Sequence, residues 1–310
     1  MTDIFATSSG ELHRLTEFAE GCWAHLTDPE PDEINSVLDF FAIDTDFIKA
    51  ALDEEESPHI EHEDCGTLIM VDIPIVQPDE KSFLYTTLPL GIILCGKGIV
   101  TICLKETAII NDFMEGRVRS FSVNKKYRFL LQILYRNASK FLQYLKQIDK
   151  ASSVVESELH KSMKNRELIQ MLRLEKSLVY FSTSLTGNEL VLEKLLRTSS
   201  LTRYPDDEDL LEDVIIENKQ AIEMCTIYRD ILSGTMDAYA SVISNNLNIV
   251  MKLLASVTIL LSVPQIIYSL FGMNTGVPFE GTSSGFWIVL GISVVVTLAV
   301  AFVMWIKKMF

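Results

Sequence analysis

The tripeptide Gly272-Met273-Asn274 directly follows a long uncharged apolar run. A glycine just past a helix is an ordinary cap and asparagine tolerates turn geometry, so the residue types alone say little. Their position says more. Repeated around a ring of chains, Asn274 would present neutral amide and backbone oxygens at the mouth of a path. Such acceptors suit a cation that gives up its water reluctantly, such as Mg²⁺ held through its hydration shell.

The apolar run before this tripeptide also carries polar side chains, namely Ser256, Thr258, Ser262, Gln265, Tyr268 and Ser269. Polar groups at membrane depth face a pore or another helix. A lone two-helix hairpin cannot enclose a polar path, whereas several copies related by cyclic symmetry can. We therefore expect this run to form an inner ring, with Ser262 and Gln265 among its lining residues. Hydrogen bonding of serine and threonine between helices is the alternative.

Two apolar runs, Leu253 to Phe271 and Phe286 to Ile306, are long enough to cross a membrane. At about 1.5 Å per residue they cover roughly 29 and 32 Å, which matches a hydrocarbon core of about 30 Å. The one formal charge between them is Glu280, within the linker of residues 272–285. Buried helices of soluble domains rarely run this long without a charge. The sequence therefore predicts a membrane hairpin, with the second span as the outer helix.

Basic residues predict the orientation of this hairpin. Lys252 precedes the first span, Lys307 and Lys308 follow the second, and the linker has no Lys or Arg. Because such residues stay on the cytoplasmic side, both termini are expected in the cytoplasm and the linker outside, in a multi-pass plasma-membrane protein. No cleavable signal is visible in residues 1–5.

Composition narrows the class further. The 310 residues leave room for about two structural units, and the net charge of −15 argues against a nucleic-acid partner. An acidic surface suits divalent cations. The five cysteines include no CxxC pair and an odd member, which predicts neither a disulfide framework nor a thiolate zinc site. No nucleophile with an adjacent base is evident, so an enzyme is not expected.

Residues 1–125 read as a cytoplasmic α/β domain. Strands are expected at residues 23–27, 67–73, 90–94 and 99–103, and Asp28-Pro29-Glu30-Pro31 signals a turn and a helix start. Gly96-Lys97-Gly98 is interpreted as a hairpin turn, because no helix with Lys-Ser or Lys-Thr follows it as in a phosphate-binding loop.

Helical periodicity dominates from residue 126. Antiparallel helices are expected over 126–205, with a possible interruption at Gly187-Asn188, and a stalk helix over 206–252 that continues into the first span. If it is helical throughout, Asp207 to Phe271 extends about 98 Å, of which about 30 Å fits in lipid. Its apolar seam needs cover, which predicts oligomerisation. The predicted fold class is an α+β cytoplasmic domain followed by stalk helices and two transmembrane helices, mostly α overall.

Two segments have metal-capable side chains. His59 to Cys65 reads either as a soft-metal site or, preferably, as a solvated acidic turn before a strand. The acidic run Asp206 to Asp209 reads either as a metal site or, preferably, as a charge set at a helix N-terminus.

Five segments resemble the CorA family of magnesium transporters. They are Tyr228 to Gly234, Asp237-Ala238-Tyr239, Ser244 to Lys252, Pro264, and Tyr268 to Asn274, and the similarity is strongest over residues 207–306. Segments Glu158 to Ser162 and Glu175 to Phe181 are similar to bacterial members. The resemblance implies a homopentameric Mg²⁺ channel for influx, with Gly272, Met273 and Asn274 as the selectivity filter. Mg²⁺ is then substrate and regulatory ligand, with no other cofactor.

The resemblance also implies roles for individual residues. Met251, Leu254 and Thr258 match the narrow constriction near the cytoplasmic side, and Asn248 and Asp237 match polar pore positions nearer the inner mouth. Asp213 matches an acidic residue at which cytoplasmic Mg²⁺ binds between subunits and favours closure. The linker departs from the family's Met-Pro-Glu-Leu pattern, and Glu280 is expected to be the outer cation-attracting charge.

Two other readings remain open. One is a related transporter for Zn²⁺, Co²⁺ or Ni²⁺, since neutral oxygens discriminate hydrated ions weakly. The other is a non-conducting, membrane-anchored coiled-coil sensor or scaffold.

Overall fold

The computed structural model describes residues 1–8, 11–79, 82–162, 165–197, 205–273, 275–278 and 284–307. The chain divides into two compact units, Met1–Gly234 and Thr235–Phe310. We describe each unit separately. One helix, α6, begins in the first unit and ends in the second.

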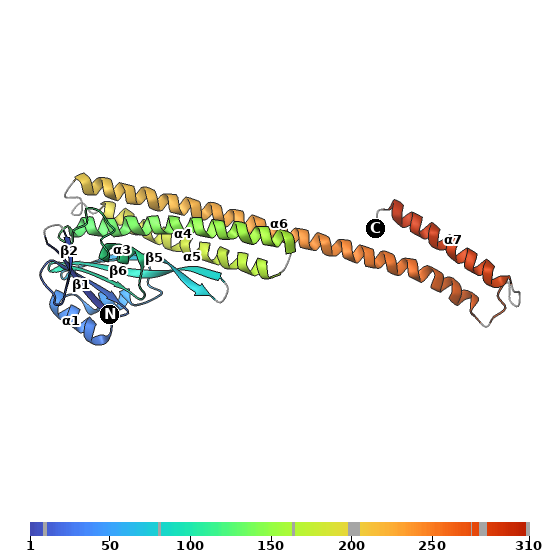
Figure 1. The fold of residues 1–310 in the computed structure, drawn as a ribbon, viewed down its shortest axis with the longest axis horizontal. Coiled ribbons are helices and arrows are strands. Elements are labelled where there is room, and N and C mark those ends of the chain that lie inside the picture. Colours follow the sequence, from blue (N-terminus) through green and yellow to red (C-terminus); the bar gives the residue numbers. More distant parts are fainter. Residues whose placement is uncertain are drawn as a thin grey trace. The chain divides into compact units, whose positions relative to one another are not determined.

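The first unit contains a seven-stranded sheet (Figure 1). Its spatial order is β2-β1-β3-β7-β6-β5-β4, and only the β3–β7 pair is parallel. The strands are β1 (Thr2–Ser8), β2 (Glu11–Leu15), β3 (Cys22–Thr27), β4 (His59–Glu63), β5 (Gly66–Asp79), β6 (Ser82–Cys95) and β7 (Gly98–Cys103).

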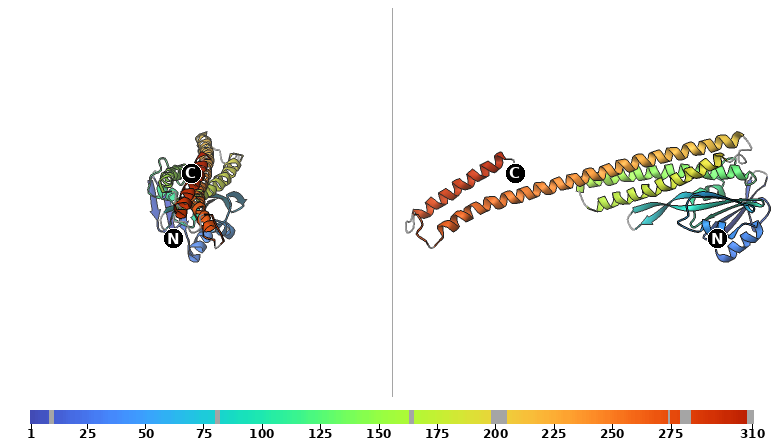
Figure 2. Two further views of the ribbon diagram at one scale, coloured as in Figure 1. Left: turned by 90° about the vertical axis from the view of Figure 1, so that its right-hand side faces the viewer. Right: turned by 180° about the vertical axis from the view of Figure 1, so that it is seen from behind.

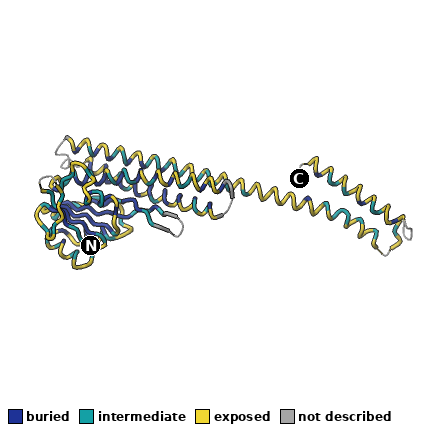
Figure 3. Tube along the Cα trace, viewed as in Figure 1, coloured by how far each residue is buried: buried dark blue, intermediate teal, exposed yellow. Residues whose placement is uncertain are grey.

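Helices cover both faces of this sheet. Helices α1 (Pro31–Phe41) and α2 (Thr45–Ala51) lie on one face, and α3 (Ala108–Met114), α4 (Lys126–Ser162) and α5 (Asn165–Arg197) lie on the other (Figures 1 and 2). The side chains of strand β5 show why both faces of the sheet are covered. Leu68 and Met70 belong to the core beneath α1 and α2, whereas Ile69 and Val71 belong to the core beneath α3, α4 and α5. The two-residue period of a strand thus supplies two separate cores. The strands of the sheet are largely buried (Figure 3).

The sequence predicted four strands correctly and missed three. Strands β3, β5, β6 and β7 contain the expected segments. Strands β1 and β2, and the edge strand β4, were not expected. The interpretation of His59 to Cys65 as a turn was wrong for His59–Glu63, which pairs antiparallel with β5 through His59↔Met70 and Glu63↔Gly66. Only Asp64 and Cys65 form the turn.

The hairpin turn predicted at Gly96-Lys97-Gly98 is confirmed, because β6 ends at Cys95 and β7 begins at Gly98. Gly98 has a packing role as well. A Cβ at this position would lie 2.2 Å from the Cys22 carbonyl oxygen on the neighbouring parallel strand. The glycine permits this close approach of backbones.

The interruption expected at Gly187-Asn188 is wrong, since α5 continues through both residues. Both residues serve packing instead. A Cβ at Gly187 would approach the Pro58 ring to 2.9 Å. The Asn188 amide accepts a 2.8 Å hydrogen bond from the Asp72 N–H and donates one of 2.8 Å to the Asp72 carbonyl. These bonds replace a strand neighbour, because β4 pairs with β5 only as far as Met70.

Helix α6 (Pro205–Phe271) is 67 residues long, about 100 Å at 1.5 Å per residue. In the first unit it packs on α4 and α5. The Asn218 amide donates to the Leu185 carbonyl (3.2 Å), and Ser139 donates to Glu217 (3.1 Å). Helix α4 ends at Ser162 and helix α5 begins at Asn165, a division that the periodicity did not reveal.

The second unit contains the rest of α6 and helix α7 (Gly285–Ile306), which returns alongside it (Figures 1 and 2). Both helices are long and apolar enough to cross a membrane. Only 6% of each apolar window is buried, which is unlike the core helix of a soluble protein. The surface of this unit is largely exposed in the single chain (Figure 3).

We expect Asn188→Ala to destabilise the protein by about 2 kcal/mol, because it leaves the Asp72 N–H without its partner in a region that is largely closed to water. A thermal melt of the full-length protein in detergent measures this change. Thr186→Ala, at an exposed position of the same helix, is the matched control and should change stability by less than about 0.5 kcal/mol. Equal melting temperatures for the two variants would show that the Asn188 amide does not secure the strand.

Candidate functional site

The residues that the sequence predicts to line a pore lie on one face of α6. Successive residues turn by about 100° in an α-helix. On that basis the predicted residues fall within roughly 60° of a common direction. They are Asp237, Asn248, Met251, Leu254, Thr258, Ser262 and Gln265. We call this face, from Asp237 to Met273, the polar stripe.

The polar stripe faces away from α7. Ser256 is fully buried in the second unit, and four further residues of α6 at three- or four-residue spacing are partly buried: Leu260, Val263, Ile267 and Phe271. In this unit the described element that can cover them is α7, whose Ser293 and Met304 are likewise buried. By helical geometry this buried face lies roughly opposite the polar stripe.

Most of the polar stripe is exposed in a single chain. Asp237, Asn248, Met251, Leu254, Thr258 and Gln265 are exposed, and Ser262 is partly buried to a similar degree as Leu260. A surface that α7 does not cover is available to other copies of the chain or to a water-filled path.

The stripe's hydroxyl groups bond within their own helix. Thr258 donates to the Leu254 carbonyl and Ser262 donates to the Thr258 carbonyl, both at 2.8 Å. Within this single chain both hydroxyl protons are therefore used inside α6. Because each hydroxyl keeps its acceptor lone pairs, the stripe still offers neutral oxygens to a hydrated ion.

At its C-terminal end the stripe becomes a shallow groove. Its lining repeats at helical spacing and consists of Ser262, Gln265, Ile266, Ser269, Leu270 and Met273. Helix α6 ends at Phe271, and the Gly272 N–H donates to the Tyr268 carbonyl at 2.9 Å, which closes the last turn. Asn274 and Glu280 lie outside the residues that the structure describes.

Ser244 and Ser269 belong to the same stripe and were not among the predicted lining residues. The signal that finds them is the three- and four-residue spacing from Asn248 and Gln265. They extend the row of neutral oxygens toward both ends of the helix.

Asp213 lies on the exposed side of α6 in the first unit. Its neighbours Leu211 and Val214 are buried in the core beneath α3, α4 and α5, which fixes the helix so that Asp213 points outward. No hydrogen bond or ion pair of this carboxylate occurs within the described ranges of the chain. It is therefore free to meet a cation or another copy of the protein.

The acidic run at residues 206–209 has the expected helix-terminal position. Asp206, Asp207 and Glu208 occupy the first turn of α6, where carboxylates are favoured by the helix dipole. Asp207 is buried and lies 3.4 Å from the Arg128 guanidinium of α4. This pair locks the start of α6 to α4 and leaves Asp207 occupied.

The His59 to Cys65 segment does not assemble a metal centre. His59 and His62 are three residues apart on a strand and so project from opposite faces. Their rings bond to the Ser57 carbonyl and the Thr67 hydroxyl, at 2.8 and 2.9 Å. Within the described part of the chain, no group of three or more His, Cys, Asp and Glu side chains could hold a metal ion.

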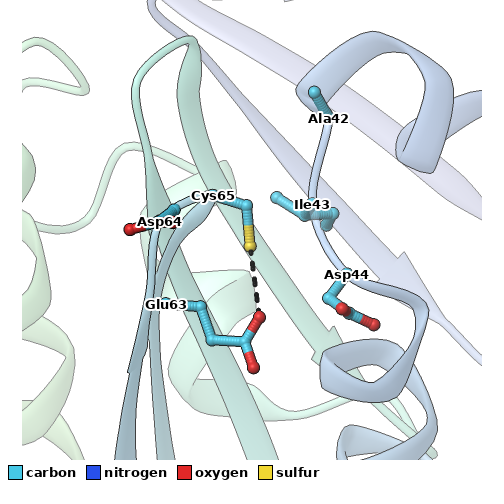
Figure 4. Close-up of a pocket in the computed structure, with 6 residues that line it drawn as sticks. All are labelled: Ala42, Ile43, Asp44, Glu63, Asp64 and Cys65. Atoms are coloured by element: carbon cyan, nitrogen blue, oxygen red, sulfur yellow. Dashed lines mark hydrogen bonds between the residues drawn. The ribbon is translucent and has the colours of Figure 1, made fainter.

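A groove beside this segment is lined by residues 42–44 and 63–65 (Figure 4). Asp44 caps helix α2 by accepting from the Asp46 N–H at 2.8 Å, Cys65 lies 4.0 Å from Glu63, and Asp64 points away from Asp44. These side chains serve local structure.

Comparison with known proteins identifies the family. The family of CorA-like Mg²⁺ transporter proteins matches residues 18–308. The cobalt/magnesium transport protein CorA of Methanocaldococcus jannaschii is 27% identical over 291 residues, covering 91% of this chain and 89% of the relative. The protein of the same name from Thermotoga maritima is 23% identical over 292 residues, covering 92% and 82%.

The fold agrees with this match. The complete structure of the CorA magnesium transporter from M. jannaschii has a TM-score of 0.85 at 25% identity, covering 98% of this chain and 97% of that one. The full-length CmaX protein shares the fold alone, with a TM-score of 0.73 at 14% identity. The predicted fold class, an α+β domain followed by long helices and two membrane-spanning candidates, is thus confirmed.

The family match covers the α/β domain, the stalk and both candidate spans, and its members are transporters rather than enzymes. With its polar stripe on an apolar helix and its full-length structural counterpart, this chain belongs to the family of CorA-like Mg²⁺ transporter proteins.

Proposed function

We propose that five copies of this chain assemble around an axis and conduct Mg²⁺ into the cell along a path lined by α6. The observation that carries this proposal is the polar stripe from Asp237 to Met273, which lies on the side of α6 away from α7. Polar side chains at membrane depth need a wet or protein-lined environment. A closed ring gives every copy of the stripe the same inward position.

In this assembly α7 forms the outer ring, and hydrated Mg²⁺ is selected at Gly272, Met273 and Asn274. Both termini lie in the cytoplasm of a plasma-membrane protein, as the positions of Lys252 and Lys307 favour. Glu280 supplies the outer charge that attracts cations. A potential of about 100 mV, negative inside, favours entry of a divalent ion by roughly 4.6 kcal/mol and supplies the driving force.

Co²⁺ is a second candidate cargo. Both curated relatives are named as cobalt/magnesium transport proteins. Neutral oxygens such as those of Thr258, Ser262 and Gln265 offer hydrogen bonds to any hexahydrated divalent ion. This chemistry does not separate Mg²⁺ from Co²⁺ strongly.

Cytoplasmic Mg²⁺ closes the channel by binding at acidic surfaces between subunits. Asp213 is exposed, on a helix whose opposite side is fixed in the core. Carboxylates that face each other across an interface repel, and a bridging divalent ion stabilises the symmetric closed ring. When internal Mg²⁺ falls, the bridge is lost and the ring loosens.

Expression of the chain should restore growth on low Mg²⁺ to a bacterium that lacks Mg²⁺ uptake, and Asn274→Ala should abolish this rescue. The amide oxygens at the mouth would be lost, and with them the contacts to hydrated Mg²⁺. The mass of the purified assembly is the control. It should equal the mass of five chains for both the wild type and the Asn274→Ala variant. Wild-type influx through a well-assembled Asn274→Ala variant would exclude the filter, and assembly of the wild type without growth or flux would favour a scaffold.

The polar stripe should be accessible from water. In a Cys65→Ser background, Ser262→Cys and Ser269→Cys should react with a charged thiol reagent at least tenfold faster than Leu260→Cys, which faces α7. The other native thiols should stay silent. Burial raises the pKa of Cys103 to about 12 and that of Cys225 to about 11, and it also raises the pKa of the Cys22 and Cys95 thiols. Equal labelling at residues 260 and 262 would contradict a water-filled path along this face.

Asp213→Ala should weaken inhibition by internal Mg²⁺, because it removes the carboxylate that a bridging ion needs. Flux into vesicles at a series of internal Mg²⁺ concentrations measures the half-inhibiting concentration, which should rise severalfold. Glu223→Gln, an exposed acidic position on the same helix, is the matched control for loss of one negative charge. Unchanged inhibition in Asp213→Ala would remove this residue from the sensor.

A further inference from the structure

Two lysines at one end of the membrane hairpin lack a counter-ion. Lys252 on α6 and Lys307 directly after α7 form no ion pair among the residues described for the second unit. Asp237 is the carboxylate that this part of the unit offers, and it lies 15 residues before Lys252, about 22 Å along the helix. An ion pair needs a separation of about 4 Å. In a symmetric ring every copy has Asp237 at the same depth. The Asp237 of a neighbouring copy is therefore just as far from Lys252 along the ring axis.

These lysines lie at the same depth. Lys252 precedes Gly272 by 20 residues and Lys307 follows Gly285 by 22, which correspond to about 30 and 33 Å along two neighbouring helices. Helix α7 runs back alongside α6 in both views of the unit (Figures 1 and 2). Both ammonium groups are therefore one hydrocarbon thickness away from the linker, at the level of lipid headgroups.

Aromatic residues mark the same level. Trp305 is 69% exposed and packs near Phe302, with ring centroids 6.2 Å apart. At the other end of α7, Trp287 is also 69% exposed and contacts Phe286. The two tryptophans are 18 residues apart, about 27 Å, so each falls near one interface of a bilayer. The indole N–H of Trp305 thus lies at the headgroup level with Lys307.

We propose that Lys252, Lys307 and Trp305 bind the phosphodiester headgroup of an anionic phospholipid at the cytoplasmic face. The inference rests on the membrane topology of the proposed function and adds a lipid site to it. Two ammonium groups with no carboxylate nearby among the residues described for this unit attract a lipid that carries net negative charge, and the indole N–H donates a further hydrogen bond. A zwitterionic lipid offers the phosphate but no net charge.

The test uses the full-length protein in nanodiscs made of equal amounts of phosphatidylcholine and phosphatidylglycerol. Native mass spectrometry reports which lipid stays bound to the assembly. The wild type should retain phosphatidylglycerol preferentially. Loss of each lysine should weaken this preference about fivefold, so Lys252→Gln with Lys307→Gln should weaken it roughly 25-fold. Lys219→Gln, an exposed lysine of the same helix in the first unit, is the matched control and should leave it unchanged.

Three results would overturn the proposal: equal retention of both lipids by the wild type, an unchanged preference in the double variant, or displacement of the lipid by excess inorganic phosphate. If the double variant fails to assemble, Lys307→Gln alone and Lys307→Arg decide the matter, since arginine should keep the preference. Mg²⁺ flux measured in closed vesicles of the same lipid composition separates the lipid-site proposal from the channel proposal. Lipid preference without flux would refute the proposed channel and leave the lipid site standing.

Discussion

A helix that enters lipid must satisfy its own backbone, and α6 stays helical from Pro205 to Phe271, with Pro264 as an internal position that has no N–H to donate. Both units of the structure contain part of this one helix. Its first half is fixed in the first unit by Asn218, Glu217 and the pair of Asp207 with Arg128, and its second half carries the polar stripe. The acidic surface around Asp213 and the apolar end of α6 are therefore parts of one continuous helix.

The polar stripe and the buried face give two sides of α6 different roles. Ser256 is buried, whereas Thr258 and Ser262 satisfy their hydroxyl protons on their own helix and keep lone pairs free. A helix can therefore be apolar enough to insert and still present oxygens along one side. Several copies give that side a shared interior, which a single chain cannot provide.

Sequence periodicity was sufficient for α6, α7 and four of the strands, but not for the division between α4 and α5. The uncharged runs, the spacing from Asp237 to Gln265 and the strands with consecutive β-branched residues all carry strong local signals. Strand β4 was missed because its alternating histidines and glutamates resemble a solvated turn, and only pairing with β5 explains it. Asn188 was misread because its amide bonds a strand 116 residues away in sequence, which no local pattern records.

The contact of Asn188 with Asp72 also affects whether other molecules can pair with strand β5. Strand β5 extends well past the last residue of β4, and the uncovered stretch would expose backbone donors and acceptors to a strand from any other molecule. The Asn188 and Asn137 amides occupy the Asp72 groups on that border. Side chains from two helices thereby occupy backbone groups on which a strand of another molecule could otherwise pair.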